Sequence, residues 1–182
     1  VPGFDGRSFL PLLDGEQQSG RDQVFTQFNH IHGRKPYPMR AVLTKSMAYV
    51  FNPWSDGQRS YSAEPLSGLT FRAMEKAGRE DPAIEKRVRH LQYRIVEELY
   101  DLRTDPDCLY NLLGNSDYDE QLADLREQLL VWMTQTNDSV LPSFRDRDDV
   151  DALEAFMDSY SMQAKHEMEA RRIYEEGTGY RF

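Results

Sequence analysis

The sequence has few of the residues that cross-link small domains, and it lacks the long apolar runs that cross membranes. Its 182 residues include one cysteine, Cys108, so neither an intrachain disulfide nor a cysteine-based zinc cluster can form. No apolar run approaches the roughly 20 residues that span a bilayer, and the first residues show no basic or apolar signal segment. We therefore expect no membrane span. A single cysteine does not indicate whether the compartment is oxidising or reducing.

Positive charge is scarce as well. Lys and Arg number 22 against 31 Asp and Glu, which leaves a formal net charge of −9. Non-specific attraction to nucleic acid or to anionic lipid would need an excess of basic residues. We therefore expect no nucleic-acid partner, and a polyanionic substrate would have to meet a local basic patch.

The common motifs of stand-alone hydrolases are also missing. The chain has no Gly-rich phosphate loop, no Gly-x-Ser-x-Gly elbow and no His-Glu-x-x-His pair. Cys108 has no partner base near it in sequence, so we do not expect a nucleophile there. We interpret the remaining titratable residues as solvated turn, strand-edge or surface groups: Glu97, Glu98, Asp105, Asp107, His90 and His166. The sequence assigns no catalytic residue to this chain.

The composition that is present is globular. Hydrophobic residues make up 39% and charged residues 29%, and the length is enough for one compact unit with its own core. Residues 22–30 alternate, and 39–43 and 47–51 are β-prone runs separated by a short turn. Residues 97–102 form a further short strand pattern. These four segments predict antiparallel strands.

Helical patterns occupy most of the remaining chain. The strongest is a stripe that follows the candidate cap residues 115–117 and consists of Tyr118, Leu122, Leu125, Leu129 and Trp132. Weaker patterns cover 82–93 and 150–175, and 65–79 allows one helix with a shared face of Leu66, Leu69, Ala73 and Ala77. The predicted fold class is α+β, a small four-stranded antiparallel sheet packed by a long helix, with additional helices.

One short segment gathers groups that could meet a ligand. His30 and His32 are one residue apart, so in a strand both imidazoles project to the same face and could reach one ligand, anion or metal. Arg34, Lys35 and Arg40 form the basic stretch beside them, and an Arg fork suits sulfate or carboxylate. Two histidines without a third ligand do not predict a metal site. A solvated loop is the alternative interpretation.

Three segments resemble sulfatases, in the order found near the C-termini of that family. Residues 4–15 read Phe-Asp-Gly-Arg-Ser-Phe-Leu-Pro-Leu-Leu-Asp-Gly, and 37–42 read Tyr-Pro-Met-Arg-Ala-Val, with Tyr-Val-Phe-Asn following at 49–52. Residues 98–106 read Glu-Leu-Tyr-Asp-Leu-Arg-Thr-Asp-Pro, and Tyr-Asn-Leu follows at 110–112. The resemblance covers about residues 4–141. Within the family, this part of the chain is most similar to the heparan N-sulfatase (sulfamidase) branch.

The resemblance implies a subdomain rather than a complete enzyme. Such a subdomain completes a larger α/β catalytic domain, whose chemistry uses a formylglycine made in a C/S-x-P-x-R motif and a Ca²⁺ ion held by Asp and Asn. None of these motifs occurs in this chain, and Cys108 is followed by Leu-Tyr-Asn, so it is not the formylglycine precursor. The segment 25–37 is where sulfatases contribute substrate-contacting residues. The resemblance therefore makes His30, His32 and Arg40 the candidate substrate-binding residues.

The resulting expectation is a C-terminal part of a longer sulfatase, from a periplasmic, secreted or lysosomal parent, that acts on sulfated sugars. We expect 1–21 to be the connection from the catalytic domain, 22–141 the subdomain, and 142–182 a charged linker with a C-terminal helix. Expected partners are the catalytic N-terminal domain and a sulfated saccharide, with a homo-oligomer as a further possibility. Two alternatives stay open: a binding or oligomerisation module that uses the last helix, and a related phosphoesterase of the alkaline-phosphatase superfamily.

Overall fold

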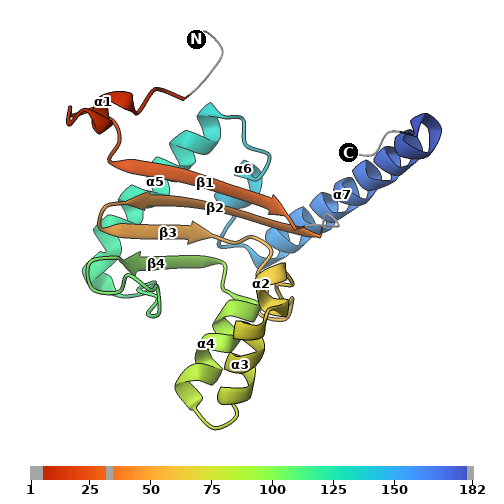
Figure 1. Ribbon diagram of the computed structural model, residues 1–182, viewed down its shortest axis with the longest axis horizontal. Coiled ribbons are helices and arrows are strands. Elements are labelled where there is room, and N and C mark those ends of the chain that lie inside the picture. Colours follow the sequence, from red (N-terminus) through yellow and green to blue (C-terminus); the bar gives the residue numbers. More distant parts are fainter. Residues whose placement is uncertain (1–5, 32–34, 180–182) are drawn as a thin grey trace.

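The computed structural model describes residues 6–31 and 35–179, and a four-stranded sheet lies at its centre (Figure 1). The strands are β1 (Gln23–His30), β2 (Pro36–Thr44), β3 (Met47–Phe51) and β4 (Glu97–Asp101). They lie side by side in this order, and each pairs antiparallel with its neighbour. The predicted α+β class and its four strands are confirmed.

The hairpin between β2 and β3 closes without the favoured Asn-Gly turn. The hydroxyl oxygen of Thr44 accepts backbone N–H bonds from Ser46 at 3.3 Å and from Met47 at 2.9 Å. A threonine side chain can replace a backbone acceptor in this way, so the turn residues and not a glycine set the register. In that register Val42 lies opposite Tyr49, and Tyr49 lies opposite Leu99 of β4.

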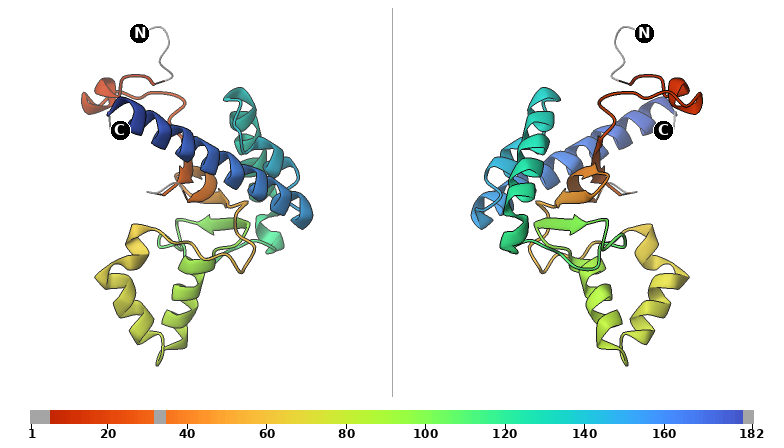
Figure 2. Two further views of the ribbon diagram at one scale, coloured as in Figure 1. Left: turned by 90° about the vertical axis from the view of Figure 1, so that its right-hand side faces the viewer. Right: turned by 90° about the vertical axis from the view of Figure 1, so that its left-hand side faces the viewer.

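The predicted long helix, α5 (Asp119–Gln135), covers one face of the sheet (Figures 1 and 2). A one-turn 3₁₀ helix over Ser116–Tyr118, capped by the Asn115 side chain, leads into it. The helix and the sheet share one core, which includes Val42, Tyr49, Leu99, Leu122, Leu125, Leu129 and Met133. Burial of such side chains contributes roughly 1.5–3 kcal/mol each. This contact is therefore the main stabilising layer of the fold.

The core continues beyond the predicted boundary at residue 141. Helix α6 (Leu141–Arg145) places the Phe144 ring edge-on against Phe51, with ring centroids 5.0 Å apart. Helix α7 (Val150–Thr178) adds Leu153 to the same core before it extends past the edge of the sheet (Figure 1). The predicted division thus separates residues that the structure packs together, and the charged run 145–149 includes the end of α6 and the turn between two packed helices.

The connection from β3 to β4 contains three helices that project from the sheet (Figure 1). They are α2 (Glu64–Ser67), α3 (Leu69–Ala77) and α4 (Pro82–Tyr93), and α3 packs against α4. Gly78 ends α3, and a Cβ there would lie 3.1 Å from the Glu85 backbone, so the close approach of the two helices suits glycine.

The single helix predicted over 65–79 is wrong. Gly68 is extended, with φ −74° and ψ 166°, and it divides the segment into α2 and α3. The predicted apolar face fails with it, because Leu69 is 84% exposed and Phe71 is the buried residue of α3. The break resets the helical phase between Leu66 and Leu69, so residues spaced for one continuous helix no longer share a face.

The chain before β1 contains a short helix, α1 (Leu10–Leu13), at one end of the molecule (Figure 1). It exposes the apolar side chains of Phe9, Leu10 and Leu13. No helix in the described parts of the chain is both long and apolar enough to cross a membrane.

Candidate substrate-contacting site

Arg40 is buried and fully engaged near the end of β1. Its guanidinium donates to both carboxylate oxygens of Asp138, at 2.5 and 2.8 Å, and the Arg40 residue is 2% exposed. It also donates to the Asn29 side chain at 2.9 Å and to the backbone oxygens of Phe28 at 3.1 Å and Met39 at 2.9 Å. Asp138 lies between α5 and α6. The Arg40 side chain therefore joins β1 and β2 to the helical layer.

His30 is the last residue of β1 and pairs with Pro36 across the sheet. Its ring stacks against Tyr160 of α7, with centroids 6.2 Å apart. Burial raises the pKa of Tyr160, against the opposing effect of the Arg40 charge, so Tyr160 lies within electrostatic reach of Arg40 as well. Tyr160 thus lies close to both of the described candidates.

The three predicted residues are therefore placed as follows. His30 is partly exposed at the end of β1. Arg40 is buried and forms an ion pair with Asp138. His32 and the basic residue Arg34 lie outside the described residues. A contact between Arg40 and a substrate would require the buried ion pair to open. The substrate-binding role of all three stays a prediction.

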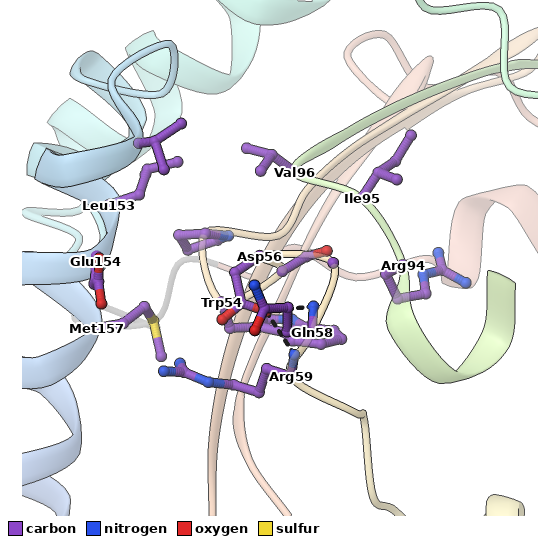
Figure 3. A pocket seen from close by; sticks show the side chains of 14 residues that line it. Trp54, Asp56, Gln58, Arg59, Arg94, Ile95, Val96, Leu153, Glu154 and Met157 are labelled. Carbon is purple, nitrogen blue, oxygen red and sulfur yellow. Dashed lines mark hydrogen bonds between the residues drawn. The ribbon is translucent and has the colours of Figure 1, made fainter. Parts of the chain in front are cut away.

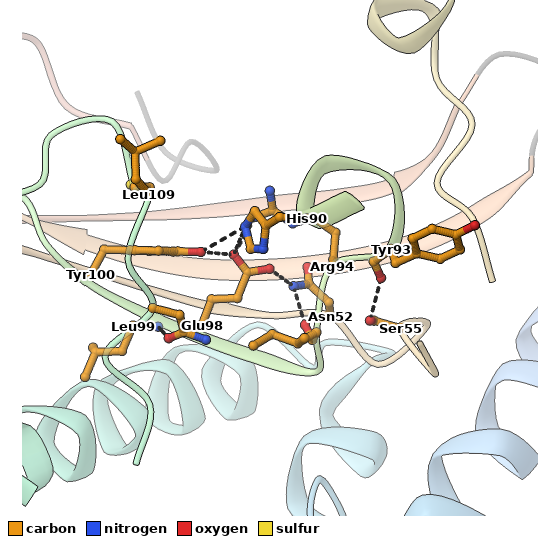
Figure 4. Close-up of polar contacts among 12 residues, drawn as sticks. Asn52, Ser55, His90, Tyr93, Arg94, Glu98, Leu99, Tyr100 and Leu109 are labelled. Atoms are coloured by element: carbon orange, nitrogen blue, oxygen red, sulfur yellow. Dashed lines mark hydrogen bonds and ion pairs between the residues drawn. The ribbon is translucent and has the colours of Figure 1, made fainter. Parts of the chain in front are cut away.

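The interpretation of Glu98 as a solvated strand-edge group is wrong. Glu98 is 0% exposed, and its carboxylate accepts bonds from Tyr100 at 2.6 Å, Arg94 at 2.7 Å and Asn52 at 2.9 Å (Figure 4). Burial would raise the pKa of Glu98, but the His90 imidazole beside it and the Arg94 charge together lower it below its usual range. The network joins α4, β3 and β4 and is structural.

His90 belongs to this network and is not the surface histidine that we expected. Its Nε2 lies 3.2 Å from the Tyr100 hydroxyl and 3.6 Å from a Glu98 carboxylate oxygen (Figure 4). Burial, the Glu98 charge and the hydrogen bond to Glu98 raise the pKa of Tyr100, so its hydroxyl stays protonated and donates. His166 is exposed on α7, as predicted.

Glu97 is buried on the opposite face of β4, and its solvated interpretation is also wrong. Arg126 of α5 donates to its two carboxylate oxygens at 2.8 and 2.6 Å, and the Tyr49 hydroxyl donates to it as well. Arg147 approaches the same carboxylate at 3.5 Å. Glu97 therefore fastens α5 to the sheet and takes no visible part in a solvent-facing site.

The third of the sulfatase-like segments, residues 98–106 and 110–112, includes β4 and continues into a tightly bonded loop after it. The Asp105 carboxylate accepts backbone N–H bonds from Leu109 and Tyr110, both at 2.8 Å. The Asn111 side chain accepts from the Leu99 backbone at 2.9 Å and donates to the Glu97 carbonyl at 3.2 Å. The polar residues of this motif thus hold the loop along β4.

Few sequence signals would have revealed the two buried glutamates. Both sit in a strand whose neighbours, Val96 and Leu99, are apolar, and a buried carboxylate requires cationic partners. Arg94 lies four residues before Glu98 and was the available hint. Arg126 is too distant in sequence to be paired by pattern. Among the described residues, no three His, Cys, Asp or Glu side chains gather in a geometry that could hold a metal ion.

Comparison with known proteins decides the relationship of this chain. Human N-sulphoglucosamine sulphohydrolase is 33% identical over 138 residues, which cover 73% of this chain and 26% of that protein. The chain is related to the sulfatases. The ulvan-active sulfatase of Formosa agariphila is 28% identical over 139 residues, which cover 74% of this chain and 25% of that enzyme. This sulfatase-related chain thus spans about a quarter of the length of the curated relatives that it matches.

No family model matches the chain. Solved structures similar to this sulfatase-related chain include a protein from Bacteroides thetaiotaomicron VPI-5482 that is assigned as a sulfatase, with a TM-score of 0.48 and 22% identity. A 2-O GAG sulfatase is similar with a TM-score of 0.48 and 21% identity. Each likeness covers 80% of this chain and 23% of the other.

Proposed function

We propose that this chain is the C-terminal subdomain of a sulfatase that hydrolyses sulfate ester or sulfamate groups on sulfated sugars. In this proposal the chain braces the catalytic domain and lines one wall of the substrate cleft. The observation that carries it is the 33% identity across 73% of the chain, combined with the quarter of the relatives' length that the chain spans. One relative is named for N-sulphoglucosamine and the other for ulvan, which supports a saccharide substrate.

The bracing role is supported by the sheet face opposite α5. Phe25 stacks on Trp132 of α5, so its neighbours in the alternation point to the other face. On that face Val24 is 59% exposed and Phe28 is 36% exposed. Exposed apolar groups of this kind, together with those of α1, mark an interaction surface. The catalytic domain is the occupant that we propose for it.

The cleft-wall role rests on His30 and on the residues that hold it. Arg40 bonds to Phe28 and Asn29, the two residues that directly precede His30, so we assign Arg40 the positioning of this strand end. His30, with His32, then offers imidazole groups to a sugar or to a flanking anionic group. The nucleophile and the Ca²⁺ ligands of the reaction belong to the catalytic domain, because this chain contains neither motif. No chemical step is assigned to the residues of this chain.

The test compares the full-length gene product with the isolated 182-residue chain. Both are assayed with sulfated glucosamine, an aryl sulfate and an aryl phosphate. We expect a C/S-x-P-x-R motif upstream, sulfatase activity in the full-length protein, and no turnover above buffer by the chain alone. A full-length protein that prefers the aryl phosphate would instead be the related phosphoesterase. Turnover by the chain alone, abolished by a mutation within it, would contradict the division of roles.

A further inference from the structure

A cavity of about 550 Å³ lies between the start of β2, the loop after β3 and α7. Each of these three elements contributes one cation to its lining: Lys35 from the approach to β2, Arg59 from the loop and Lys165 from α7. Among the described residues, no acidic side chain lines it. In a chain of net charge −9, three cations thus share one cavity whose described lining contains no counter-charge.

These cations are free to meet a ligand. Among the described residues, no carboxylate lies within ion-pairing distance of Lys35, Arg59 or Lys165. The Asp56 carboxylate in the loop accepts backbone N–H bonds from Gln58 and Arg59, at 2.9 and 2.5 Å. Burial would raise the pKa of Asp56, but these bonds and the Arg59 charge lower it, so Arg59 has one carboxylate within electrostatic reach. A cavity lined by charges of one sign concentrates ions of the opposite sign.

Two of the segments that line the cavity, the loop after β3 and strand β2, are held together by direct contacts. The Tyr37 hydroxyl donates to the Ser60 carbonyl at 2.9 Å and so ties the loop to β2. The rings of Trp54 and Tyr61 pack on Tyr37 at centroid distances of 5.1 and 4.9 Å. Figure 3 shows the Arg59 side chain reaching from this loop toward α7 near Met157. These contacts hold the backbone of the loop that carries Arg59, so less ordering of that backbone is needed when a ligand binds.

Arg59 also lines a second cavity of about 510 Å³ farther along α7, which includes Trp54, Leu153 and Met157 (Figure 3). The two cavities together follow α7 from Val150 to Met168. At 1.5 Å per helical residue this is a path of roughly 27 Å. The second cavity also contains the carboxylates of Asp56 and Glu154, so an anionic group fits the first cavity, and the second suits an uncharged part of a longer ligand.

The basic cavity adjoins the proposed cleft wall. The backbone carbonyl of Lys35 accepts a hydrogen bond from the backbone N–H of Ile31 at 3.2 Å, and Pro36 pairs with His30. We propose that Lys35, Arg59 and Lys165 form a subsite for a sulfate or carboxylate group of a sulfated saccharide, away from the group that reacts. The serine hydroxyls of Ser60 and Ser161 in the lining suit sugar hydroxyls, and the apolar floor carries Pro36, Ala164 and Met168. The choice of a saccharide rests on the proposed function.

Direct binding tests the subsite without any need for turnover. The 182-residue chain is titrated calorimetrically at low ionic strength with a heparin-derived oligosaccharide, an unsulfated saccharide of equal length, sodium sulfate and single-stranded DNA. We expect the sulfated oligosaccharide to bind and the unsulfated one not to bind. Lys165→Glu should lower the affinity about fivefold, the upper end for an exposed charge contact, because a carboxylate that repels the ligand replaces the ammonium group. The loss should shrink as salt is added.

Lys86→Glu on α4 is the matched control, because it changes the net charge equally on an exposed helical surface outside the cavity. An equal loss of affinity in both variants would mean that only the net charge of the chain matters, and it would overturn the proposed subsite. Failure of the sulfated oligosaccharide to bind would do the same, and DNA binding of equal strength would overturn the saccharide assignment. A parent that lacks sulfatase activity would contradict the proposed function and leave these binding outcomes unchanged.

Discussion

Arg40 and Asp138 lie 98 residues apart in sequence and form a buried two-bond ion pair, at 2.5 and 2.8 Å. The pair joins β2 to the turn between α5 and α6, and Asp138 also caps that turn by accepting from the Val140 backbone at 2.8 Å. Neither side chain has an alternative partner of opposite charge among the described residues. The pair therefore fixes the sheet end that carries His30.

Asp138→Ala should lower the free energy of unfolding by about 3–5 kcal/mol, because it leaves the Arg40 charge buried without its carboxylate. Denaturant unfolding followed by circular dichroism measures the loss. Asp148→Ala removes an exposed aspartate nearby and should change stability by less than about 0.5 kcal/mol. Equal effects of the two substitutions would show that the buried pair contributes nothing special.

Leu125→Asp should destabilise the chain by several kcal/mol, since Leu125 is 2% exposed at the contact of α5 with the sheet. The substitution would place a charge in an apolar core without a partner. Denaturant melts provide the measurement, and Val131→Asp on the exposed side of α5 is the control. A loss below about 1 kcal/mol for Leu125→Asp would mean that α5 does not pack as described.

The buried carboxylates predict acid sensitivity. The pKa of Glu98 is lowered in the folded chain, and Arg103 hydrogen bonding lowers the pKa of Asp101 to about 2. The unfolded chain takes up these protons first, near its ordinary carboxyl pKa of roughly 4. Their stabilisation is therefore present above that pH and is lost as the pH falls through the lower folded values.

Glu98→Gln should remove part of this pH dependence and cost about 2 kcal/mol at neutral pH through the lost charge-assisted bonds. Unfolding free energies measured between pH 7 and pH 3 provide the comparison. Glu154→Gln, an exposed change on α7, serves as the control and should follow the unmodified chain. A Glu98→Gln profile that parallels the unmodified chain at every pH would contradict the assigned role of the network.

His30→Ala in the full-length enzyme should lower kcat/KM for a sulfated saccharide and leave a small aryl sulfate unaffected. A group that orients the sugar away from the reacting atoms acts on ground and transition states alike, so KM rises more than kcat falls. His166→Ala, on the exposed surface of α7, is the control. If both substrates respond equally, or neither does while the protein stays folded, His30 is not a specificity residue.

Local pattern was sufficient to predict the sheet and its main helix. The alternation of β1 predicts a strand and the stripe of α5 predicts one buried helical face, and the structure has both elements within a few residues of the predicted ends. No residue of β1 is fully buried, although apolar residues on both of its faces suggested burial. The helix break at Gly68 was missed because the residues around it keep helical spacing although the backbone does not. Spacing alone cannot show where the phase is reset.

The polar interior could not be predicted, for a different physical reason. Whether a carboxylate is buried depends on whether a cation reaches it, and those partners come from separate segments. Glu97 pairs with Arg126 of α5, and Arg40 pairs with Asp138 in the turn after that helix. Nothing in the sequence near Glu97 or Arg40 specifies these pairings. The basic cavity shows the same limit, because its three cations come from three elements.

The segment that contains α2, α3 and α4 begins and ends at adjacent points of the sheet. Phe51 pairs with Glu97 across β3 and β4, and the Asn52 backbone donates to the Val96 carbonyl at 2.7 Å, so the two ends are already closed. The entropy of closing a longer connection rises only slowly with its length. The part of this segment before His90 can therefore lengthen or shorten during evolution while the sheet keeps its register, whereas His90 and Arg94 must stay in place because Glu98 is buried against them.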